Sequence, residues 1–582
     1  MTNPLAPVQY RVDLADAAAH RYRVTLTVRD AAPEQLLSLP VWIPGSYMVR
    51  EFGRHLSGIT ARQGGRERVV QPLDKTTWQV ATSGRAALTV SYEVYAFDTS
   101  VRTAFLDDRR GFFNATSLCL RVHGQEARDH QLQITGLPAG WDVATAMPAL
   151  AGARHGFVSA GYDELVDHPV ELGRFWRGRF EAGGVPHEFV VAGAWPGFDG
   201  ERLLADTRRI CAAQIAFWHG RGKPPFGRYV FLLNAVEEGY GGLEHRASTA
   251  LLCNRRDLPR TGQAGMGEGY LTLLGLISHE YFHTWNVKRL KPREFLQFDY
   301  SRENYTRLLW FFEGFTSYYD DLMLRRAGLI DSARYLKLIA RTVNGVRATP
   351  GQQVQSVAEA SFDAWVKYYR PDENTPNSTV SYYTKGSLVA LLLDLHLRRA
   401  GHSLDALMRR LWKVALRDGV TEQLLLDEVA TLGGPAVAEA LRGWVHGRGP
   451  LPLDEALVAA GVHLAHEPAA WATALGLKLS EGALTGVQVK SVLRGSAAEA
   501  AGLSPGDELL AVDGWRIRRL DDARQWVADG RPCELLLVRD QRVRTLTLRA
   551  GGDAALGQTV ALSPEASPSD AARAMRRAWL GD

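Results

Sequence analysis

The sequence predicts a multidomain α+β protein, and changes in its pattern along the chain divide it into parts. Short alternating apolar and polar segments fill residues 1–167, which is typical of an N-terminal antiparallel β-sandwich. Residues 168–452 are rich in strands up to about residue 267 and then follow the periodicity of helices. Short strands and small helices return in residues 453–551, and residues 552–582 predict a linker and a C-terminal helix. A chain of 582 residues is too long for one hydrophobic core, so several domains are expected.

The overall charge and hydropathy exclude several classes of function. The 68 Lys and Arg residues nearly balance the 64 Asp and Glu residues, so the chain lacks the strong field that attracts nucleic acid or anionic membranes. No apolar run approaches the roughly 20 residues of a spanning helix, and the first residues lack the pattern of a secretory signal. The four cysteines show no CxxC spacing, which disfavours a disulfide framework. We therefore expect a cytoplasmic protein without nucleic-acid or membrane partners.

The strands of the first part are predicted by alternation that Gly, Pro and Asp clusters interrupt. Clear examples lie at residues 10–14, 21–28 and 86–97. No long helical pattern separates these segments, so antiparallel pairing within a sandwich is expected. Residues 41–55, VWIPGSYMVREFGRH, are rich in aromatic and turn-forming residues, and we expect a structured loop that packs against the next domain.

The next part mixes strands with one helix, predicted at residues 201–220, and then reaches EEGYGGLEHRAST at residues 237–249. This segment contains three glycines, Gly239, Gly241 and Gly242. They would let an extended backbone pass close to another chain, as an edge strand over a peptide-binding cleft requires. An ordinary glycine-rich hairpin is the alternative.

Two histidines and a glutamate share the helix predicted over residues 271–285. The motif HEYFH places His279 and His283 four residues apart, so both imidazoles leave one helix face and can converge on one metal ion. Glu280 is turned about 100° around the axis, where it can face a water bound to that metal. Burying the three side chains without a cation would leave a carboxylate uncompensated, which disfavours a purely structural histidine pair. The sequence therefore predicts one catalytic Zn²⁺ ion.

A catalytic zinc ion needs a third protein ligand and an open position for water. Glu313 is the candidate, because it lies in the apolar stretch LLWFFEGFTSYY, where an unpaired carboxylate would be costly to bury. We expect its helix to begin near Ser301 and to end at Gly328. Further helices are predicted from residues 332, 386, 403 and 421.

The order of these motifs resembles a known peptidase family. HEYFH followed by a helix with E-G-F is similar to the gluzincin metallopeptidases, whose thermolysin-like domain binds zinc through two His and one Glu. The motifs WIPGSYMVREF, GGLEH, HEYFHTWNVKRLKP, FFEGFTSYY and SYYTKG, followed by a PDZ-like domain, resemble the glycyl aminopeptidase family over nearly the whole chain. The resemblance implies a thermolysin-like zinc peptidase domain at residues 168–452 and a PDZ-like domain at residues 453–551.

The resemblance also implies a role for each matching residue of the peptidase domain. His279, His283 and Glu313 would hold zinc, and Glu280 would be the general base that takes a proton from the attacking water. Glu244 of GGLEH would pair with the free α-amino group of the substrate, which makes a peptidase an exopeptidase. Gly241 and Gly242 belong to the same segment as Glu244 and would also contact the substrate.

The resemblance assigns the oxyanion donor to Tyr383 of YTKG, with the adjacent Tyr382 as the alternative. One position departs from the pattern of thermolysin-like sites, which often carry an acidic residue one turn after the Glu ligand. Ser317 occupies that position here, and Asp320 is the candidate for supporting a histidine instead.

In the PDZ-like domain the implied carboxylate-binding loop is Leu475, Gly476 and Leu477, beside which a peptide would add as a β-strand. Its expected partner is the C-terminal end of a peptide. A PDZ fold that only docks on the catalytic domain is the alternative.

These expectations combine into one function with two alternatives. We expect a zinc-dependent aminopeptidase that removes small N-terminal residues, with Gly and Ala favoured, from peptides with a free N-terminus. One alternative is a zinc endopeptidase guided by its PDZ domain, with Glu244 structural. The other is a PDZ peptide-binding scaffold with a non-catalytic metallopeptidase domain, against which Glu280 argues because a binding module needs no base.

Overall fold

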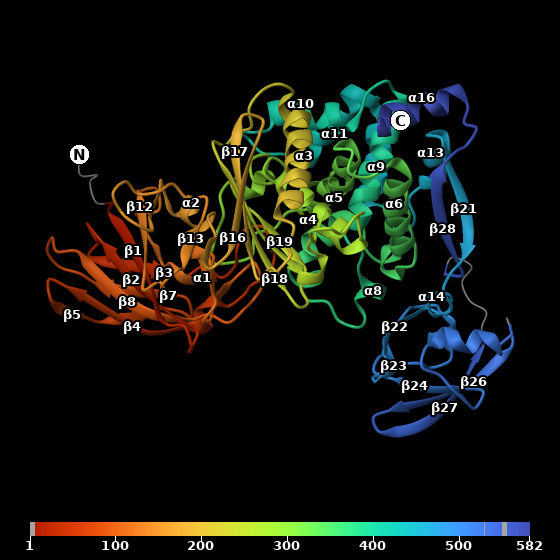
Figure 1. The fold of residues 1–582 in the computed structure, drawn as a ribbon, viewed down its shortest axis with the longest axis horizontal. Coiled ribbons are helices and arrows are strands. Elements are labelled where there is room, and N and C mark those ends of the chain that lie inside the picture. The colour runs from red at the N-terminus through yellow and green to blue at the C-terminus, as the bar shows by residue number, and fades with distance from the viewer. Residues whose placement is uncertain (1–5, 483, 529, 550–555, 582) are drawn as a thin grey trace. The chain divides into compact units, whose positions relative to one another are not determined.

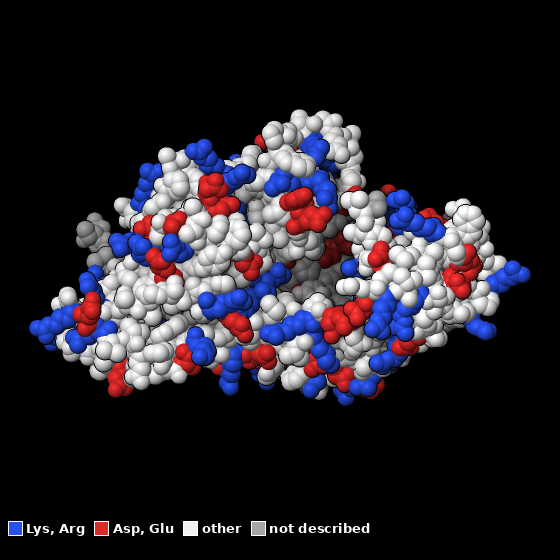
Figure 2. All heavy atoms as spheres, turned by 90° about the horizontal axis from the view of Figure 1, so that it is seen from below, with Lys and Arg blue, Asp and Glu red and all other residues white. Residues whose placement is uncertain are grey.

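The computed structural model describes residues 6–482, 484–528, 530–549 and 556–581 (Figure 1). The chain divides into two compact units, Met1–Asn304 and Tyr305–Asp582. None of the described helices combines the length and the hydrophobicity needed to cross a membrane. On the face shown in Figure 2, basic and acidic side chains are mixed, as the nearly balanced composition predicts.

The first unit begins with the predicted β-sandwich. One sheet has seven strands in the order β14-β12-β1-β2-β8-β4-β5. Their bounds are β1 Val8–Asp16, β2 Arg21–Val28, β4 Leu56–Gln63, β5 Arg66–Arg68, β8 Leu88–Tyr95, β12 His130–Thr135 and β14 Gly156–Ser159. Strand β2 alternates between buried and more exposed residues, as its sequence predicts. Pairing is antiparallel with one exception, because β1 and β12 run parallel. These two strands are far apart in the sequence, so no hairpin turn fixes their relative direction.

Two four-stranded sheets complete the sandwich, in the orders β13-β15-β10-β9 and β11-β3-β7-β6. Their bounds are β3 Glu34–Ser38, β6 Val70–Pro72, β7 Thr77–Ala81, β9 Ala104–Leu106, β10 Arg110–Phe113, β11 Arg121–Val122, β13 Asp142–Ala144 and β15 Val170–Gly173. Two short helices, α1 (Ala115–Leu118) and α2 (Tyr162–Val166), lie between strands. Apolar side chains of the sandwich form one buried cluster that includes Tyr10, Val24 and Tyr92.

The loop at residues 41–55 is structured and contacts a distant part of the same unit. Gly45 has φ +95°, and Ser46 N–H donates to Ile43 O at 3.1 Å, which with Pro44 makes a type II turn. Trp42 donates its indole N–H to Asp299 O at 2.8 Å. The loop therefore packs against the segment that follows the HEYFH helix.

The rest of the first unit is a five-stranded sheet with two long helices. The strand order is β16-β17-β18-β20-β19, with β19 at an edge. The bounds are β16 Trp176–Ala182, β17 Val185–Ala192, β18 Tyr229–Val236, β19 Gly241–Glu244 and β20 Ser248–Asn254. Helices α3 (Gly200–His219) and α4 (Glu268–Phe282) contact each other, and α4 packs against β19 and β20. The glycine-rich segment is therefore an edge strand beside the helix that carries HEYFH.

The second unit is helical up to residue 459. Its helices are α5 Leu309–Arg326, α6 Ser332–Arg347, α7 Val357–Phe362, α8 Thr375–Ser378, α9 Thr384–Arg399, α10 Leu404–Val414, α11 Glu422–Gly433, α12 Pro435–His446 and α13 Leu453–Ala459. Helix α5 begins at Leu309, whereas the sequence predicts a start near Ser301. Asp299 explains the difference, because its carboxylate accepts from the Ser301 N–H at 2.9 Å and its carbonyl accepts from Asn304 Nδ2 at 2.7 Å. These bonds hold a polar turn where the helix was expected.

Helices α5 and α9 pack against each other through two glycines. A Cβ at Gly314 would lie 2.6 Å from the Gly386 backbone, and a Cβ at Gly386 would lie 2.7 Å from Trp310 O. Only glycine allows the two backbones to come this close. The E-G-F and Y-T-K-G motifs are therefore adjacent in space.

The part of the chain predicted as a PDZ-like domain has its own sheet and its own apolar core. The strand order is β22-β23-β24-β26-β27, with β25 paired to β24. The bounds are β22 Leu477–Gly482, β23 Gly486–Val492, β24 Glu508–Val512, β25 Trp515–Arg516, β26 Pro532–Arg539 and β27 Arg542–Arg549, with helices α14 Trp471–Ala474 and α15 Ala497–Ala500.

The end of the chain returns to the helical part of the second unit. Strand β28 (Gln558–Pro564) pairs with β21 (Val462–Pro468), so part of the predicted linker is a strand, and residues 552–555 lie outside the described residues. Helix α16 (Asp570–Leu580) packs on α5 and α9. Trp579 of α16 donates its indole N–H to Tyr318 Oη at 2.9 Å, and Tyr318 donates to Asp394 at 2.6 Å. The C-terminal helix is thus joined to α5 by a buried chain of hydrogen bonds.

Candidate active site

Helix α4 directs both histidines of HEYFH to one point. The Nε2 atoms of His279 and His283 are 3.0 Å apart. The Nδ1 atom of His283 lies 2.8 Å from the carbonyl oxygen of Asn286, so this nitrogen donates and Nε2 carries the lone pair. Val287, which follows Asn286, has φ +114°, a conformation that a β-branched residue rarely adopts. The turn after α4 therefore holds the Asn286 carbonyl where it orients His283.

Glu280 is buried and lies against the edge strand. A Cβ at Gly242 would lie 2.0 Å from Glu280 Oε1, so no larger residue fits at this position without displacing the carboxylate. The sequence predicts that Gly242 lets the strand come close to a substrate. The structure shows that Gly242 also lets the strand come close to Glu280.

Glu244 is buried two residues further along β19, on the same face as Gly242. A Cβ at Gly45 would lie 2.6 Å from both carboxylate oxygens of Glu244. The Pro44–Gly45 turn of the β-sandwich therefore contacts this carboxylate directly.

A buried ionic cluster adjoins both Glu244 and the turn after α4. Asp167 lies 2.8 Å from Lys288 Nζ and accepts from the Arg246 N–H at 2.9 Å. Burial would raise the pKa of the Asp167 carboxyl, but Lys288 and then Arg246 hold it well below its ordinary value. Burial lowers the pKa of His245 to about 4, so this imidazole is neutral at pH 7. The cluster connects the end of β19, the turn after α4 and the β-sandwich.

In the second unit, Glu313 on α5 and Tyr383 at the start of α9 are close neighbours. Burial raises the pKa of the Tyr383 phenol well above its ordinary value, and the Glu313 carboxylate raises it further. The phenol therefore stays protonated at neutral pH and can donate a hydrogen bond. The Tyr383 ring stacks on Tyr368 with centroids 5.3 Å apart, whereas the adjacent Tyr382 is fully buried.

One set of described residues has the composition of a metal site. His279, His283 and Glu313 each offer one ligand atom, and the three atoms lie within 4.8 Å of one another. Two imidazole nitrogens and one carboxylate oxygen are a donor set that catalytic zinc sites use, with the fourth position left for water. The residues present therefore fit a zinc ion.

The loop predicted to bind a carboxylate in the PDZ-like domain differs from its expected form. The N–H of Leu475 donates to Trp471 O at 2.9 Å and that of Gly476 to Thr473 O at 2.9 Å. Two of the three N–H groups expected to receive a carboxylate are thus used within the turn after α14. Strand β22, which begins at Leu477, lies at the edge of its sheet.

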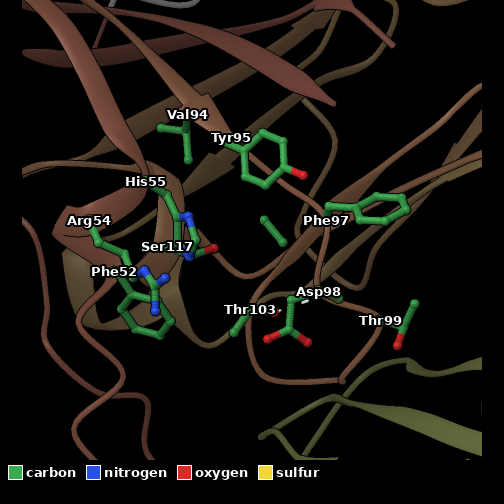
Figure 3. A pocket seen from close by; sticks show the side chains of 11 residues that line it. Phe52, Arg54, His55, Val94, Tyr95, Phe97, Asp98, Thr99, Thr103 and Ser117 are labelled. Carbon is green, nitrogen blue, oxygen red and sulfur yellow. Dashed lines mark hydrogen bonds between the residues drawn. The ribbon is translucent and has the colours of Figure 1, made fainter. Parts of the chain in front are cut away.

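A cavity of about 420 Å³ in the β-sandwich contains none of the predicted site residues. Figure 3 shows the side chains of Arg54, His55, Tyr95 and Asp98 around it. Among the described residues that line it, no three could together hold a metal ion.

Comparison with known proteins gives three family matches along the chain. Residues 9–174 match the Peptidase M61 N-terminal domain, residues 272–389 match M61 glycyl aminopeptidase, and residues 488–539 match a PDZ domain. A search of curated proteins finds no match.

Several solved structures are similar to this chain. The structure of an aminopeptidase N family protein from Idiomarina loihiensis is 37% identical, covers 98% of this chain and 100% of its own, and has a TM-score of 0.93. An M1 zinc metallopeptidase from Deinococcus radiodurans is 15% identical over 77% of this chain and 94% of its own, with a TM-score of 0.47. Yeast LTA4 hydrolase in complex with bestatin is 10% identical over 76% of this chain and 68% of its own, with a TM-score of 0.45. From the family matches and the 37% identical relative, the chain belongs to the M61 glycyl aminopeptidase family and carries a PDZ domain.

Proposed function

We propose that this protein is a zinc aminopeptidase that removes small N-terminal residues, with Gly and Ala favoured, from peptides with a free N-terminus. The observation that carries the proposal is the spacing of two buried carboxylates beside one edge strand. Glu244 is part of β19, and Glu280 lies against Gly242, two residues away. Two residues of strand span about 6.6–6.8 Å. An amino group held at Glu244 therefore leaves the first peptide carbonyl of an extended substrate one residue along, between Glu244 and the Gly242 position that Glu280 contacts.

His279, His283 and Glu313 are the residues that would hold zinc, which when bound supplies a Lewis acid for the scissile carbonyl and activates the attacking water. Glu280 takes a proton from that water and gives it to the leaving amine. His283 keeps its orientation through its bond to the Asn286 carbonyl. Tyr383 donates a hydrogen bond to the oxyanion that forms as the carbonyl is attacked.

The substrate would be held by backbone as well as by charge. Gly241 and Gly242 belong to the edge strand β19, where an extended peptide can add as a further strand. The Glu244 carboxylate favours substrates whose amino group is free, since an N-blocked peptide offers it no positive charge. In the PDZ domain, the edge strand β22 is the corresponding place for the C-terminal end of a peptide ligand, with Leu477 at its start.

The proposal is tested with Gly and Ala anilides beside N-acetylated versions of the same compounds. We expect hydrolysis of the free-amine anilides and at least about 100-fold slower hydrolysis of the blocked ones. Cleavage of only the blocked compounds would instead support the endopeptidase alternative, with Glu244 structural.

The roles of the two glutamates are separated by two variants. Glu280→Gln should keep zinc, measured as metal content of the purified protein, and lose about 100-fold or more in turnover. Glu244→Ala should mainly raise KM for substrates with a free amine. Normal turnover in Glu280→Gln would rule out Glu280 as the base, and an unchanged KM in Glu244→Ala would rule out the amine anchor.

A further inference from the structure

Arg102 comes from the β-sandwich but lies against the edge strand of the peptidase domain. Its loop connects β8 with β9, and Figure 3 shows Asp98, Thr99 and Thr103 of the same loop. The Arg102 Nη2 group donates to the carbonyl oxygen of Gly242 at 3.3 Å. A Cβ at Gly241 would lie 3.5 Å from Nη1 of the same side chain. The guanidinium is thus beside the two glycines of β19.

The loop around Arg102 is held firmly. Val101 and Phe105, on either side of Arg102, belong to a buried apolar cluster with Leu243 and Ala250 of the peptidase sheet. The buried side chain of Asn114 donates to Val101 O at 2.9 Å and to Thr103 O at 3.3 Å. Arg102 is therefore presented to β19 by a fixed backbone.

The guanidinium lies on the open edge of β19. The N–H of His245 donates to Ser248 O at 2.9 Å in the turn between β19 and β20. Because hydrogen-bonded and non-hydrogen-bonded pairs alternate in an antiparallel ladder, this bond fixes the pairing along β19. It directs the N–H and C=O groups of Gly242 and Glu244 away from β20. The carbonyl that Arg102 contacts therefore faces the edge along which a substrate strand would run.

Arg102 has donors to spare at this edge. A guanidinium offers five N–H groups in a planar fork, and the bond to Gly242 uses one of them. Its Nε atom is buried and has no hydrogen-bond partner among the described residues. A carboxylate is the ligand that such a fork matches, through two parallel hydrogen bonds.

The positions of the charged side chains along β19 indicate which carboxylate of the substrate Arg102 would bind. Glu244 is at one end, and Glu280 and Arg102 both lie near Gly242, two residues away. An extended dipeptide spans about 6.6–6.8 Å. If its amino group is at Glu244, its carboxylate is two residues along, near Arg102, and its reacting carbonyl is one residue along, between Glu244 and Gly242, the residue that Glu280 contacts. In a longer peptide a neutral carbonyl occupies that place.

We propose that Arg102 binds the α-carboxylate of dipeptides, so that the enzyme prefers dipeptides with a small first residue to longer peptides. This inference rests on the proposed function, because it takes Glu244 as the amine anchor. A substrate whose carboxylate binds the guanidinium should have a kcat/KM about 10- to 100-fold higher than one with a neutral group in that place.

The experiment compares three substrates with the same amino end: Ala-Ala, Ala-Ala-amide and Ala-Ala-Ala. Measured with the wild-type enzyme, kcat/KM should be about 10- to 100-fold higher for Ala-Ala than for its amide. Arg102→Gln should remove this preference. It should lower kcat/KM for Ala-Ala and change kcat/KM for Ala-Ala-amide by less than about threefold. Arg102→Lys should keep part of the preference, because the charge remains and the planar fork does not. Arg109→Gln, at an exposed arginine of a neighbouring turn, is the matched control and should behave as wild type.

Two results would overturn the proposal. One is a wild-type enzyme that hydrolyses Ala-Ala and Ala-Ala-amide equally well, a comparison that needs no variant and is therefore independent of how the variants fold. The other is an equal loss on both substrates in a folded Arg102→Gln. A failure of the proposed function is distinguishable, since it would appear as hydrolysis of N-acetyl-Ala-Ala-amide without hydrolysis of the free-amine substrates.

Discussion

The replacement Gly242→Ala tests the relation between the edge strand and the base. The added Cβ would lie 2.0 Å from Glu280 Oε1 and 2.3 Å from its carboxylate carbon, whereas Cβ atoms essentially never come within 3.0 Å of another heavy atom. Strand or carboxylate must therefore move by about 1 Å. A misplacement of this size at a catalytic group can lower the rate by about 100-fold.

Stability should change much less than turnover. The φ angle of Gly242 is outside the left-handed region, so alanine is tolerated by the backbone and restricts the unfolded chain by about 0.4–1 kcal/mol. We therefore expect a folded protein with an unchanged zinc content and a kcat on Gly-anilide reduced by about 100-fold.

The assay measures kcat, KM, metal content and thermal unfolding for Gly242→Ala and for Gly227→Ala. Gly227 is exposed, and a Cβ there meets nothing within 4 Å, so its replacement should leave every quantity near wild type. Wild-type kcat in Gly242→Ala would refute the reasoning, because it would mean that the position of the Glu280 carboxylate does not limit the reaction.

Four further outcomes are expected. Tyr383→Phe should lower kcat by about 100-fold with little change in KM or thermal stability, and an unchanged kcat would assign the oxyanion donor elsewhere. Trp579→Ala removes a buried indole and its bond to Tyr318, and should lower the free energy of unfolding in urea by about 3–5 kcal/mol; a loss under 1 kcal/mol would show that α16 is not docked. Burial lowers the pKa of His187 and of His245 to about 4, against about 6.5 when unfolded, so the unfolded chain binds more protons between these values and stability should fall as pH is lowered from 6.5 to 4. A flat profile would contradict this. Removing metal with a chelator should lower the unfolding temperature as well as abolish activity, and added zinc should restore both.

Much of the fold could be predicted because the signals are local. The alternation in strands such as β2 and the helical period of α4 are each carried by a few neighbouring residues. The same is true of HEYFH, in which the spacing of His279 and His283 sets their direction on a helix. The motif glycines of β19, α5 and α9 also proved to mark close approaches of backbone to a neighbouring group.

The missed features depend on contacts between distant segments. Strand β28 pairs with β21 across the whole PDZ domain, and no short window of sequence contains both strands. Arg102 lies in a loop of the β-sandwich, and only the packed structure brings it to Gly242. The support of His283 by a backbone carbonyl was also missed, since every residue has a carbonyl and only the conformation of Val287 shows where this one points.

The buried pair of Asp167 and Lys288 bears on how this enzyme can evolve and be engineered. A protein shortened to begin after β15 would lose Asp167, the counter-charge of Lys288, and would also lose the contacts that Gly45 and Arg102 make with Glu244 and Gly242 of β19. The β-sandwich is therefore not an interchangeable module. Exchanging the β-sandwich between relatives should succeed only when the residues that it contacts in the peptidase domain are exchanged with it.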